Sequence, residues 1–379
     1  MSADRFDTDV VVIGAGAVGL ACARGLTAAG RSVIVLERHD RFGVETSSRN
    51  SEVVHAGIYY AAGSLKARLC ARGNRSLYAY CESRGVPHRR IGKMIVAATP
   101  ADEPKLAEIL TRARENGVTS LGSLTPAEAR RMEPNVRCTA ALFSPDTGIV
   151  DSHEFMKSLL AETEAGGGTV AWRHTIHAAE KIDGGWRLCA RSDANEESTI
   201  TTRTVVNSAG LDADRVAALA GLDPDACGYT LHFARGHYFR VHAKKSHLAS
   251  HLIYPTPVPG GLGIHVTFDL AGGMRLGPDV QYLATRVQDY DVAEALRGPF
   301  HAAVSRYLTG LDADDLAPDL AGIRPKLSPA GAPARDFVIA EESARGLAGW
   351  VNLVGIESPG LTCALEIAAM VEGLLEVRA

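Results

Sequence analysis

The stretch VVVIGAGAVGL, residues 10–20, constrains the fold of this chain more than any other part of its sequence. The continuous apolar run Val10–Ile13 is typical of a central parallel strand that is covered on both faces. The G-x-G-x-x-G pattern that follows would provide a tight turn, backbone approach to a pyrophosphate, and close helix–strand packing. Its glycines are Gly14, Gly16 and Gly19. A helix is expected over residues 17–29, and its N-terminal N–H groups suit phosphate.

An acidic residue completes this unit. A second strand over Ser32–Leu36 ends at Glu37, where a carboxylate can accept both hydroxyls of a ribose. The glycine pattern alone also fits a packing turn, but a packing turn does not need Glu37. Because strand, helix, strand and acid occur in register, the sequence predicts nucleotide binding.

Composition and charge exclude several classes of protein. The net charge of −4 gives no basic surplus, so no nucleic-acid partner is expected. Seven scattered cysteines without a C-x-x-C pair argue against a disulfide framework or a metal site, and they indicate a reducing compartment. The protein is therefore predicted to be cytoplasmic. Neither a signal peptide nor a transmembrane segment is expected, while peripheral contact with a membrane stays open.

The rest of the chain indicates an α/β protein with a second domain. Strands are expected over residues 91–98, 169–172 and 350–354, and helices over residues 64–85, 105–116 and 291–309. From Tyr229 through Gly277, short apolar stretches between prolines and glycines indicate a separate mixed sheet. The predicted fold is a Rossmann-like nucleotide-binding domain with an inserted α+β domain on a mixed or antiparallel sheet.

Several motifs together resemble the D-amino-acid-oxidase-like FAD oxidoreductases. GAGAVGL with Glu37 and VVNSAG at 205–210 are similar to that superfamily as a whole. More specific motifs resemble its L-2-hydroxyglutarate dehydrogenase/oxidase branch, and they are SSRNSEVVHAGIYYAAGSLKARLC, AGIRPKL and GIESPGLT. The matches run from residue 9 to residue 373. One departure is Glu52, where that branch usually carries glycine.

The resemblance implies a discontinuous FAD-binding domain over residues 1–90, 142–227 and 320–379. A substrate-binding domain would take residues 91–141 and 228–319. The implied cofactor contacts are Gly14, Gly16, Ala17, Val18 and Gly19 at the pyrophosphate, Glu37 and Arg38 toward the ribose, Ser47, Ser48, Arg49 and Asn50 along the pyrophosphate and ribityl chain, Ile176 at the adenine, Ala209 and Gly210 near the nucleotide, and Gly355, Ser358, Gly360, Leu361 and Thr362 against the flavin. Because nucleotide-like features recur at three places, FAD rather than NAD is the predicted cofactor, and it is expected to be non-covalent.

Oxidation of a hydroxy acid by flavin needs a clamp for the carboxylate and a base for the hydroxyl proton. Arg324 is the predicted clamp, because arginine grips a carboxylate with two parallel donors and stays charged. His55 and His265 are the candidate bases, although each alone also fits a core or surface histidine. Further candidates for orienting the substrate or a second carboxylate are Tyr60, Tyr254 and Lys326.

The predicted function is FAD-dependent oxidation of an L-2-hydroxy acid, similar to 2-hydroxyglutarate, to the 2-oxo acid. The expected partners are a small carboxylate substrate and an electron acceptor, either oxygen or a quinone. An amino- or imino-acid oxidase on the same scaffold remains an alternative. A redox-silent nucleotide-binding subunit is another.

Overall fold

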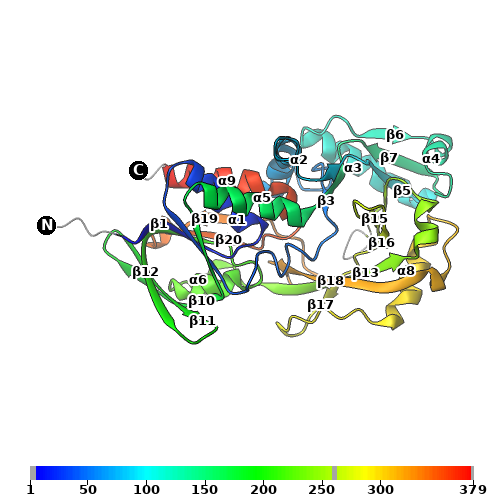
Figure 1. The fold of residues 1–379 in the computed structure, drawn as a ribbon. Helices are drawn as coiled ribbons and strands as arrows, with labels where there is room; N and C mark the ends of the chain where they lie inside the picture. The colour runs from blue at the N-terminus through cyan, green and yellow to red at the C-terminus, as the bar shows by residue number, and fades with distance from the viewer. Residues whose placement is uncertain (1–5, 258–262, 377–379) are drawn as a thin grey trace. The chain divides into compact units, whose positions relative to one another are not determined.

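The computed structural model describes residues 6–257 and 263–376, which form two compact units (Figure 1). Unit 1 consists of Met1–Ser48, Ser152–His232 and Pro325–Ala379, and unit 2 consists of Arg49–Asp151 and Phe233–Arg324. These limits differ from the predicted domains, since residues 49–90 and 142–151 lie in unit 2. A small sheet explains the difference, because β3 (Val53–Val54) and β4 (His88–Arg89) both pair with β8 (Gly148–Val150) there.

The sheet of unit 1 has the spatial order β10–β11–β12–β1–β2–β9, with β20 beside β12 and β19 beside β20. The strands are β1 (Thr8–Ile13), β2 (Val33–Glu37), β9 (Thr169–Trp172), β10 (His174–Ile182), β11 (Gly185–Ser192), β12 (Glu197–Asn207), β19 (Val338–Glu341) and β20 (Trp350–Val354). β1 runs parallel to β2 and β12, and Val11 faces Ile34 on one side and Val205 on the other. Val11 is fully buried, which confirms the predicted central parallel strand.

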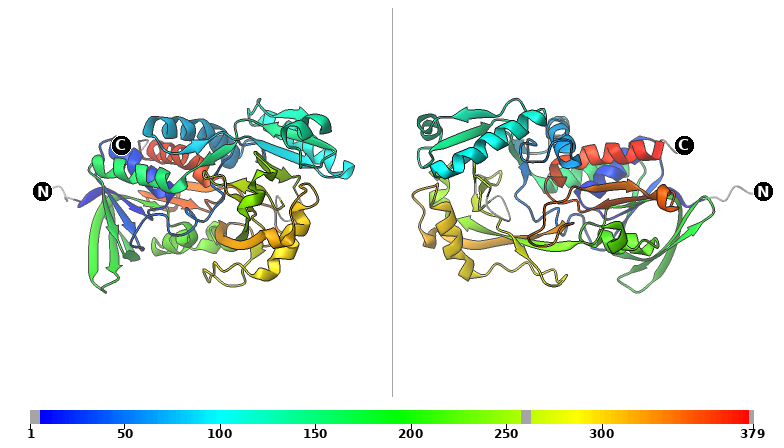
Figure 2. Two further views of the ribbon diagram at one scale, coloured as in Figure 1. Left: turned by 45° about the vertical axis from the view of Figure 1, so that its right-hand side comes forward. Right: turned by 180° about the vertical axis from the view of Figure 1, so that it is seen from behind.

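Three helices gather on one face of this sheet in the part of the chain described (Figures 1 and 2). They are α1 (Ala17–Ala28), α5 (Ser152–Ala165) and α9 (Gly360–Glu376), and α1 contacts both of the others. α6 (Ala213–Leu219) contacts β10, β12 and β20, and the short α7 (Pro224–Cys227) follows it. Strands and helices thus alternate around a parallel core, which agrees with the Rossmann-like prediction.

The main sheet of unit 2 is mixed and has the order β17–β13–β16–β15–β14–β5–β7–β6, with β18 beside β13. The strands are β5 (Lys93–Ala97), β6 (Gly122–Leu124), β7 (Ala140–Ser144), β13 (His232–Val241), β14 (Leu252–Pro255), β15 (Val266–Phe268), β16 (Met274–Leu276), β17 (Gln281–Tyr282) and β18 (Leu316–Lys326). β14 joins the two halves of the sheet, since it runs parallel to β5 and antiparallel to β15. The mixed sheet expected after Tyr229 is therefore present, and it also takes in strands from earlier in the chain.

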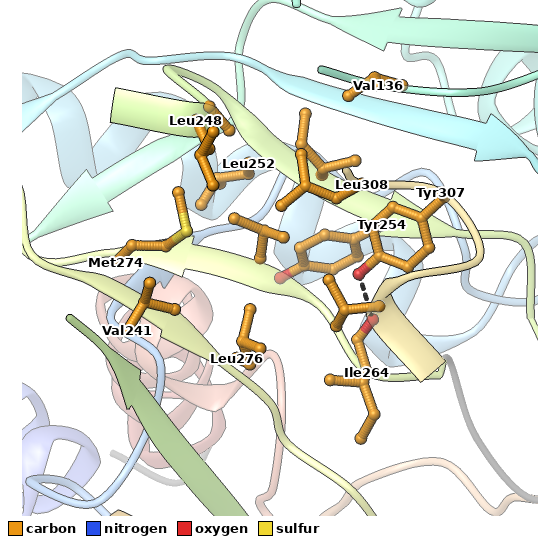
Figure 3. Close-up of a cluster of buried hydrophobic side chains, with 14 of the residues drawn as sticks. Val136, Val241, Leu248, Leu252, Tyr254, Ile264, Met274, Leu276, Tyr307 and Leu308 are labelled. Atoms are coloured by element: carbon orange, nitrogen blue, oxygen red, sulfur yellow. Dashed lines mark hydrogen bonds between the residues drawn. The ribbon is translucent and has the colours of Figure 1, made fainter. Parts of the chain in front are cut away.

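A buried apolar cluster holds unit 2 together (Figure 3). Leu252, Met274 and Leu276 are fully buried in it, and the hydroxyl of Tyr307 donates a 2.7 Å hydrogen bond to the carbonyl oxygen of Ile264. The helices of unit 2 are α2 (Leu65–Arg84), α3 (Glu103–Glu115), α4 (Pro126–Met132) and α8 (Arg297–Val304).

The helix predicted over residues 291–309 is too long. α8 covers only Arg297–Val304, preceded by the 3-10 turn Glu294–Leu296. Pro299 explains the late start, because a proline lacks the N–H that a helix interior needs but is tolerated in the first turn.

Candidate functional site

The glycine loop of unit 1 closes the turn between β1 and α1. Gly14 has a φ of 101°, and a Cβ there would lie 2.7 Å from the carbonyl oxygen of Ser208. A Cβ on Gly19 would lie 1.9 Å from the carbonyl oxygen of Gly14, so α1 packs directly against the end of β1. Gly16 precedes α1 without a side chain to cap it, and a Cβ there would meet Ser47 Oγ at 2.9 Å. Bare backbone at a helix N-terminus suits a pyrophosphate.

Glu37 lies beside this loop at the end of β2. It is 7% exposed, and its Oε2 accepts a hydrogen bond from the N–H of Ala15 at 2.7 Å. Its Oε1 accepts a bond from the N–H of His39 at 2.9 Å. Each carboxylate oxygen keeps a second lone pair. The carboxylate is therefore held in place and can still accept bonds from ribose hydroxyls, which fits the adenosine half of a dinucleotide.

The segment after β2 turns back toward the glycine loop. Nη1 of Arg38 lies 2.5 Å from Asp212 Oδ2, and Nη2 is paired with Glu45. The guanidinium of Arg38 is thus engaged by acidic side chains within unit 1. Ser47 Oγ accepts a 3.0 Å hydrogen bond from the N–H of Ala17, which is one of the amides predicted to face phosphate.

The other predicted cofactor residues of unit 1 lie in or beside strands, helices and turns of that unit. They are Val18 in α1, Ser48 at the end of the first segment, Ile176 in β10, Ala209 and Gly210 after β12, Gly355 after β20, and Ser358, Gly360, Leu361 and Thr362 around the start of α9. Ile176 adjoins an irregularity in the pairing of β10 with β11. Such a bulge leaves backbone groups outside the ladder, where they can meet a ligand.

Lys326 has an acidic partner within unit 1. Its Nζ lies 3.1 and 3.0 Å from the two carboxylate oxygens of Glu357. This ion pair ties the end of β18 to the loop between β20 and α9. The ammonium that was predicted to orient the substrate or a second carboxylate is therefore already paired in this structure.

Two of the predicted catalytic residues stack against each other in unit 2. The rings of Tyr254 and His265 lie 3.5 Å apart and within 8° of parallel. They are 1% and 6% exposed, respectively. Tyr254 lies in β14 and His265 immediately precedes β15, so the antiparallel pairing of these strands brings the rings together.

Lys93 joins this cluster and was missed by the sequence predictions. Its side chain is fully buried, and Nζ lies 4.7 Å from the ring centroids of both Tyr59 and Tyr254. Nζ has no hydrogen-bond partner among the described residues. Burial lowers the pKa of Lys93 to about 7. The sequence did contain a signal, which is a lysine at the start of an otherwise apolar strand. Because burial of a cation costs free energy, a buried lysine is a candidate for a functional role.

His55 belongs to the same cluster. Burial, and after it the charge of Lys93, lowers the pKa of His55 to about 3. The carbonyl oxygen of His55 accepts hydrogen bonds from Asn74 Nδ2 at 3.1 Å and from Cys70 Sγ at 3.5 Å, which anchor it to α2. The imidazole is therefore unprotonated at neutral pH, as a proton acceptor must be. Tyr60 lies further along the same loop.

Arg324 lies in β18 without an acidic partner. Its Nη2 donates a 3.3 Å hydrogen bond to the carbonyl oxygen of Asp279. Across residues 6–257 and 263–376 no carboxylate forms an ion pair with its guanidinium. Gly236 in β13 makes room for the arginine, because a Cβ there would lie 2.9 Å from Nη2. A partly buried cation of this kind suits an anionic ligand such as a carboxylate.

Arg49 and Asn50 lie in unit 2, beyond the end of the first segment of unit 1 at Ser48. The guanidinium carbon of Arg49 lies 4.0 Å from the ring centroid of Tyr290. Asn50 Oδ1 accepts a 2.7 Å hydrogen bond from the N–H of Glu52. The consecutive residues that the resemblance assigns to the pyrophosphate and ribityl chain are thus divided between the two units.

Within residues 6–257 and 263–376, no three or more His, Cys, Asp or Glu side chains are grouped so that they could hold a metal ion. In the same residues, no helix combines the length and the apolar character needed to cross a membrane.

Three curated relatives of the chain share the name L-2-hydroxyglutarate dehydrogenase. The chain is 41% identical to the mitochondrial L-2-hydroxyglutarate dehydrogenase of Arabidopsis thaliana, over 95% of this chain and 82% of the relative. It is 30% identical to the mitochondrial L-2-hydroxyglutarate dehydrogenase of Homo sapiens, over 100% of this chain and 90% of the relative. It is 27% identical to L-2-hydroxyglutarate dehydrogenase of Escherichia coli, over 95% of this chain and 91% of the relative. The resemblance to this branch is confirmed.

The predicted cytoplasmic location is contradicted by these relatives. Those from plant, nematode and human are named as mitochondrial proteins. The prediction rested on unpaired cysteines, and these indicate only a reducing compartment, of which the cytoplasm is one.

Solved structures share the fold. The structure matches FAD-bound L-alpha-glycerophosphate oxidase from Mycoplasma pneumoniae with a TM-score of 0.86 at 24% identity, over 97% of this chain and 94% of that one. It matches glycine oxidase from Geobacillus kaustophilus with a TM-score of 0.81 at 19% identity, over 98% of this chain and 95% of that one. The predicted fold class is therefore confirmed.

A family model described as FAD dependent oxidoreductase, DAO, matches residues 9–374, which is nearly the whole chain. The glycine loop and the fixed carboxylate of unit 1 fit the FAD that this family uses, so the predicted cofactor and enzyme class are confirmed. The chain belongs to the DAO family of FAD-dependent oxidoreductases.

Proposed function

We propose that this enzyme oxidises an L-2-hydroxy acid to the 2-oxo acid, and that L-2-hydroxyglutarate is its substrate. The names of its relatives support this substrate. The single observation that carries the proposal is Arg324, a partly buried arginine without an acidic partner among the described residues. A small hydroxy acid has few groups besides its carboxylates that a protein can bind. A guanidinium without an acidic partner can bind such a carboxylate.

Unit 1 is proposed to bind FAD and unit 2 to bind the substrate. The backbone of Gly14, Gly16 and Gly19 would hold the pyrophosphate, and Glu37 would accept the ribose hydroxyls. The turn at residues 355–362 would lie against the flavin, where the positive end of α9 favours negative charge. Bound FAD supplies the hydride acceptor.

Arg324 is proposed to bind the 2-carboxylate of the substrate. Its guanidinium presents parallel N–H donors, which fix the orientation of a carboxylate as well as its affinity. Gly236 keeps the space beside Nη2 open for the arginine. The substrate would then be held with its C2–H bond in one direction, as hydride transfer requires.

His55 is proposed to take the hydroxyl proton at a ring nitrogen. Burial, and after it the charge of Lys93, lowers its pKa to about 3, so the imidazole is neutral at pH 7, although a pKa this low makes it a weak base. The buried rings of Tyr254 and His265 exclude water from the same cluster. Of the two candidate histidines, His55 is preferred because the ring of His265 is stacked against Tyr254.

The electron acceptor is proposed to be oxygen or a quinone. The relatives are named dehydrogenases, which favours an acceptor other than oxygen. Oxygen consumption compared with reduction of a soluble quinone analogue, both with the same substrate, distinguishes the two acceptors.

Anaerobic reduction of the flavin tests the proposed substrate. The purified protein should be yellow, and L-2-hydroxyglutarate should bleach it faster than the D-enantiomer, shorter 2-hydroxy acids or amino acids. Preferential reduction by an amino or imino acid would assign the enzyme to that class instead. A flavin that no member of the panel reduces would indicate a redox-silent subunit.

A further inference from the structure

Among the residues described, the guanidinium of Arg324 lacks the acidic partner that two other arginines of unit 2 have. Arg235 is paired with Asp289, and Arg275 Nε lies 2.7 Å from Asp319 Oδ2. In the described part of the chain, Arg324 has no such partner. An acidic residue that approached it would cancel the charge that the proposed substrate site needs.

Such an acidic residue is in fact adjacent. The carbonyl oxygen that accepts the hydrogen bond from Arg324 belongs to Asp279, so the carboxylate of the same residue is attached close to the guanidinium. Rotation about the Cα–Cβ bond of Asp279 is the movement that would bring the carboxylate toward the arginine. In the structure this carboxylate is held by another residue.

That residue is His237, which is only 2% exposed. Oδ1 of Asp279 accepts a 2.7 Å hydrogen bond from the N–H of His237. Nδ1 of His237 lies 2.9 Å from Oδ1 and 3.0 Å from Oδ2, so both carboxylate oxygens are engaged. The histidine ring is shielded from solvent, whereas the side chain of Asp279 is 24% exposed.

We propose that His237 is a positioning residue that holds the carboxylate of Asp279 away from Arg324 and so keeps the guanidinium free for the carboxylate of the substrate. This inference rests on the proposed role of Arg324 as the clamp. Without the histidine, an ion pair between Asp279 and Arg324 would occupy the donors that the substrate uses. His237 therefore acts on substrate binding through two other residues and does not itself touch the substrate.

The geometry of the contact defines the test variants. His237→Leu removes the ring donor, and His237→Gln places its amide nearer the position of Nε2 than that of Nδ1. His237→Asn keeps a donor near the position of Nδ1. His237→Leu combined with Asp279→Asn removes the histidine and the acid together. His251→Gln is the matched control, because His251 Nδ1 contacts a buried carboxylate of the same unit, Glu133, at 2.5 Å.

Steady-state kinetics of the FAD-loaded variants with L-2-hydroxyglutarate give the first readout. His237→Leu and His237→Gln should raise KM about tenfold or more, equivalent to about 1.4 kcal/mol of binding free energy, with little change in kcat. His237→Asn, the double variant and the control should keep the KM of the wild type. A double variant as impaired as His237→Leu would overturn the proposal, since a merely structural histidine is not rescued by removing the acid.

Chemical modification gives a second readout that does not depend on turnover. Phenylglyoxal should label Arg324 more slowly in His237→Leu than in the wild type, and at the original rate in the double variant, as measured by peptide mapping. If this pattern holds but no 2-hydroxy acid reduces the flavin, the proposed function fails and the role of His237 stands. If the substrate is oxidised but neither KM nor labelling differs among the variants, the role of His237 is wrong.

Discussion

Single substitutions of His55 and His265 test which of the two histidines accepts the hydroxyl proton. His55→Ala should slow anaerobic reduction of the flavin by substrate by about 10²–10⁴-fold, because the hydroxyl proton would lose its acceptor. His265→Ala should have a much smaller effect, because that ring is stacked on Tyr254. Both variants should bind FAD as the wild type does. If both are reduced at the wild-type rate, neither histidine is the base, and Tyr60 or Tyr254 is the next candidate.

Lys93 shows the cost of a buried cation. Its folded-state pKa of about 7 lies below the ordinary value of 10.5, because burial disfavours the charged form. Between these pH values the unfolded chain binds the extra proton, so stability rises with pH from 7 to 10.5 at this site. The destabilisation is complete below pH 7 and disappears above pH 10.5.

Lys93→Met should therefore stabilise the fold by about 1–4 kcal/mol at pH 7 and by much less near pH 10. Denaturant unfolding at the two pH values measures this difference. Met94→Leu in the same buried strand is the control, since it should show no dependence on pH. A loss of stability in Lys93→Met at pH 7 would mean that contacts of the ammonium with the tyrosine rings outweigh its burial.

Glu52 has a backbone conformation that favours glycine. Its φ is 56°, in the left-handed region. Glu52→Gly should raise the free energy of unfolding by about 0.5–1 kcal/mol, because relief of strain exceeds the added freedom of the unfolded chain. Asn195→Gly, at a φ of 63°, should gain less, since asparagine tolerates this region. Equal gains in thermal unfolding at both positions would contradict this explanation.

At the scale of elements, the packing of α1 on β1 should control retention of the cofactor. Gly19→Ala should yield protein with little FAD, because its Cβ would lie 1.9 Å from the backbone oxygen of Gly14 and push the helix away. Gly25→Ala in the same helix is the matched control, since the nearest atom to its Cβ is 3.9 Å away. The control should keep its flavin and gain slightly in stability. Normal flavin content in Gly19→Ala, measured by absorbance, would refute the role given to this contact.

Strands and turns that are specified by neighbouring residues could be predicted from the sequence. The apolar run before Gly14 predicted β1, as observed, and Asp183–Gly184, a typical turn sequence, lies between β10 and β11. The helix expected over residues 291–309 was too long because the apolar spacing was extended upstream across Pro299, whereas α8 begins only two residues before that proline. Local patterns thus identified strands and turns, but the limits of the helix depended on a single residue.

At the scale of the molecule, the surroundings of the candidate residues could not be predicted. Gly236, Asp279 and Arg324 are far apart in the sequence, and the pairing of β13 with β18 is among the contacts that bring them together. The cluster around Lys93 likewise depends on the parallel pairing of β5 with β14. No local pattern encodes such pairings. For the same reason, the pairing of Lys326 with Glu357 was not foreseen.

The central claim is that Arg324 binds the carboxylate of a 2-hydroxy acid, and anaerobic flavin reduction by Arg324 variants tests it most directly. Arg324→Lys keeps the charge but loses the two parallel N–H donors. The value of kcat/KM should therefore fall by about 10²-fold, which corresponds to about 2.7 kcal/mol of transition-state stabilisation. Arg324→Ala should lose more, while both keep the flavin spectrum of the wild type. The methyl esters of the same acids should be poor substrates for the wild type. Unchanged kcat/KM in Arg324→Ala, or equal reduction by acids and esters, would contradict the account.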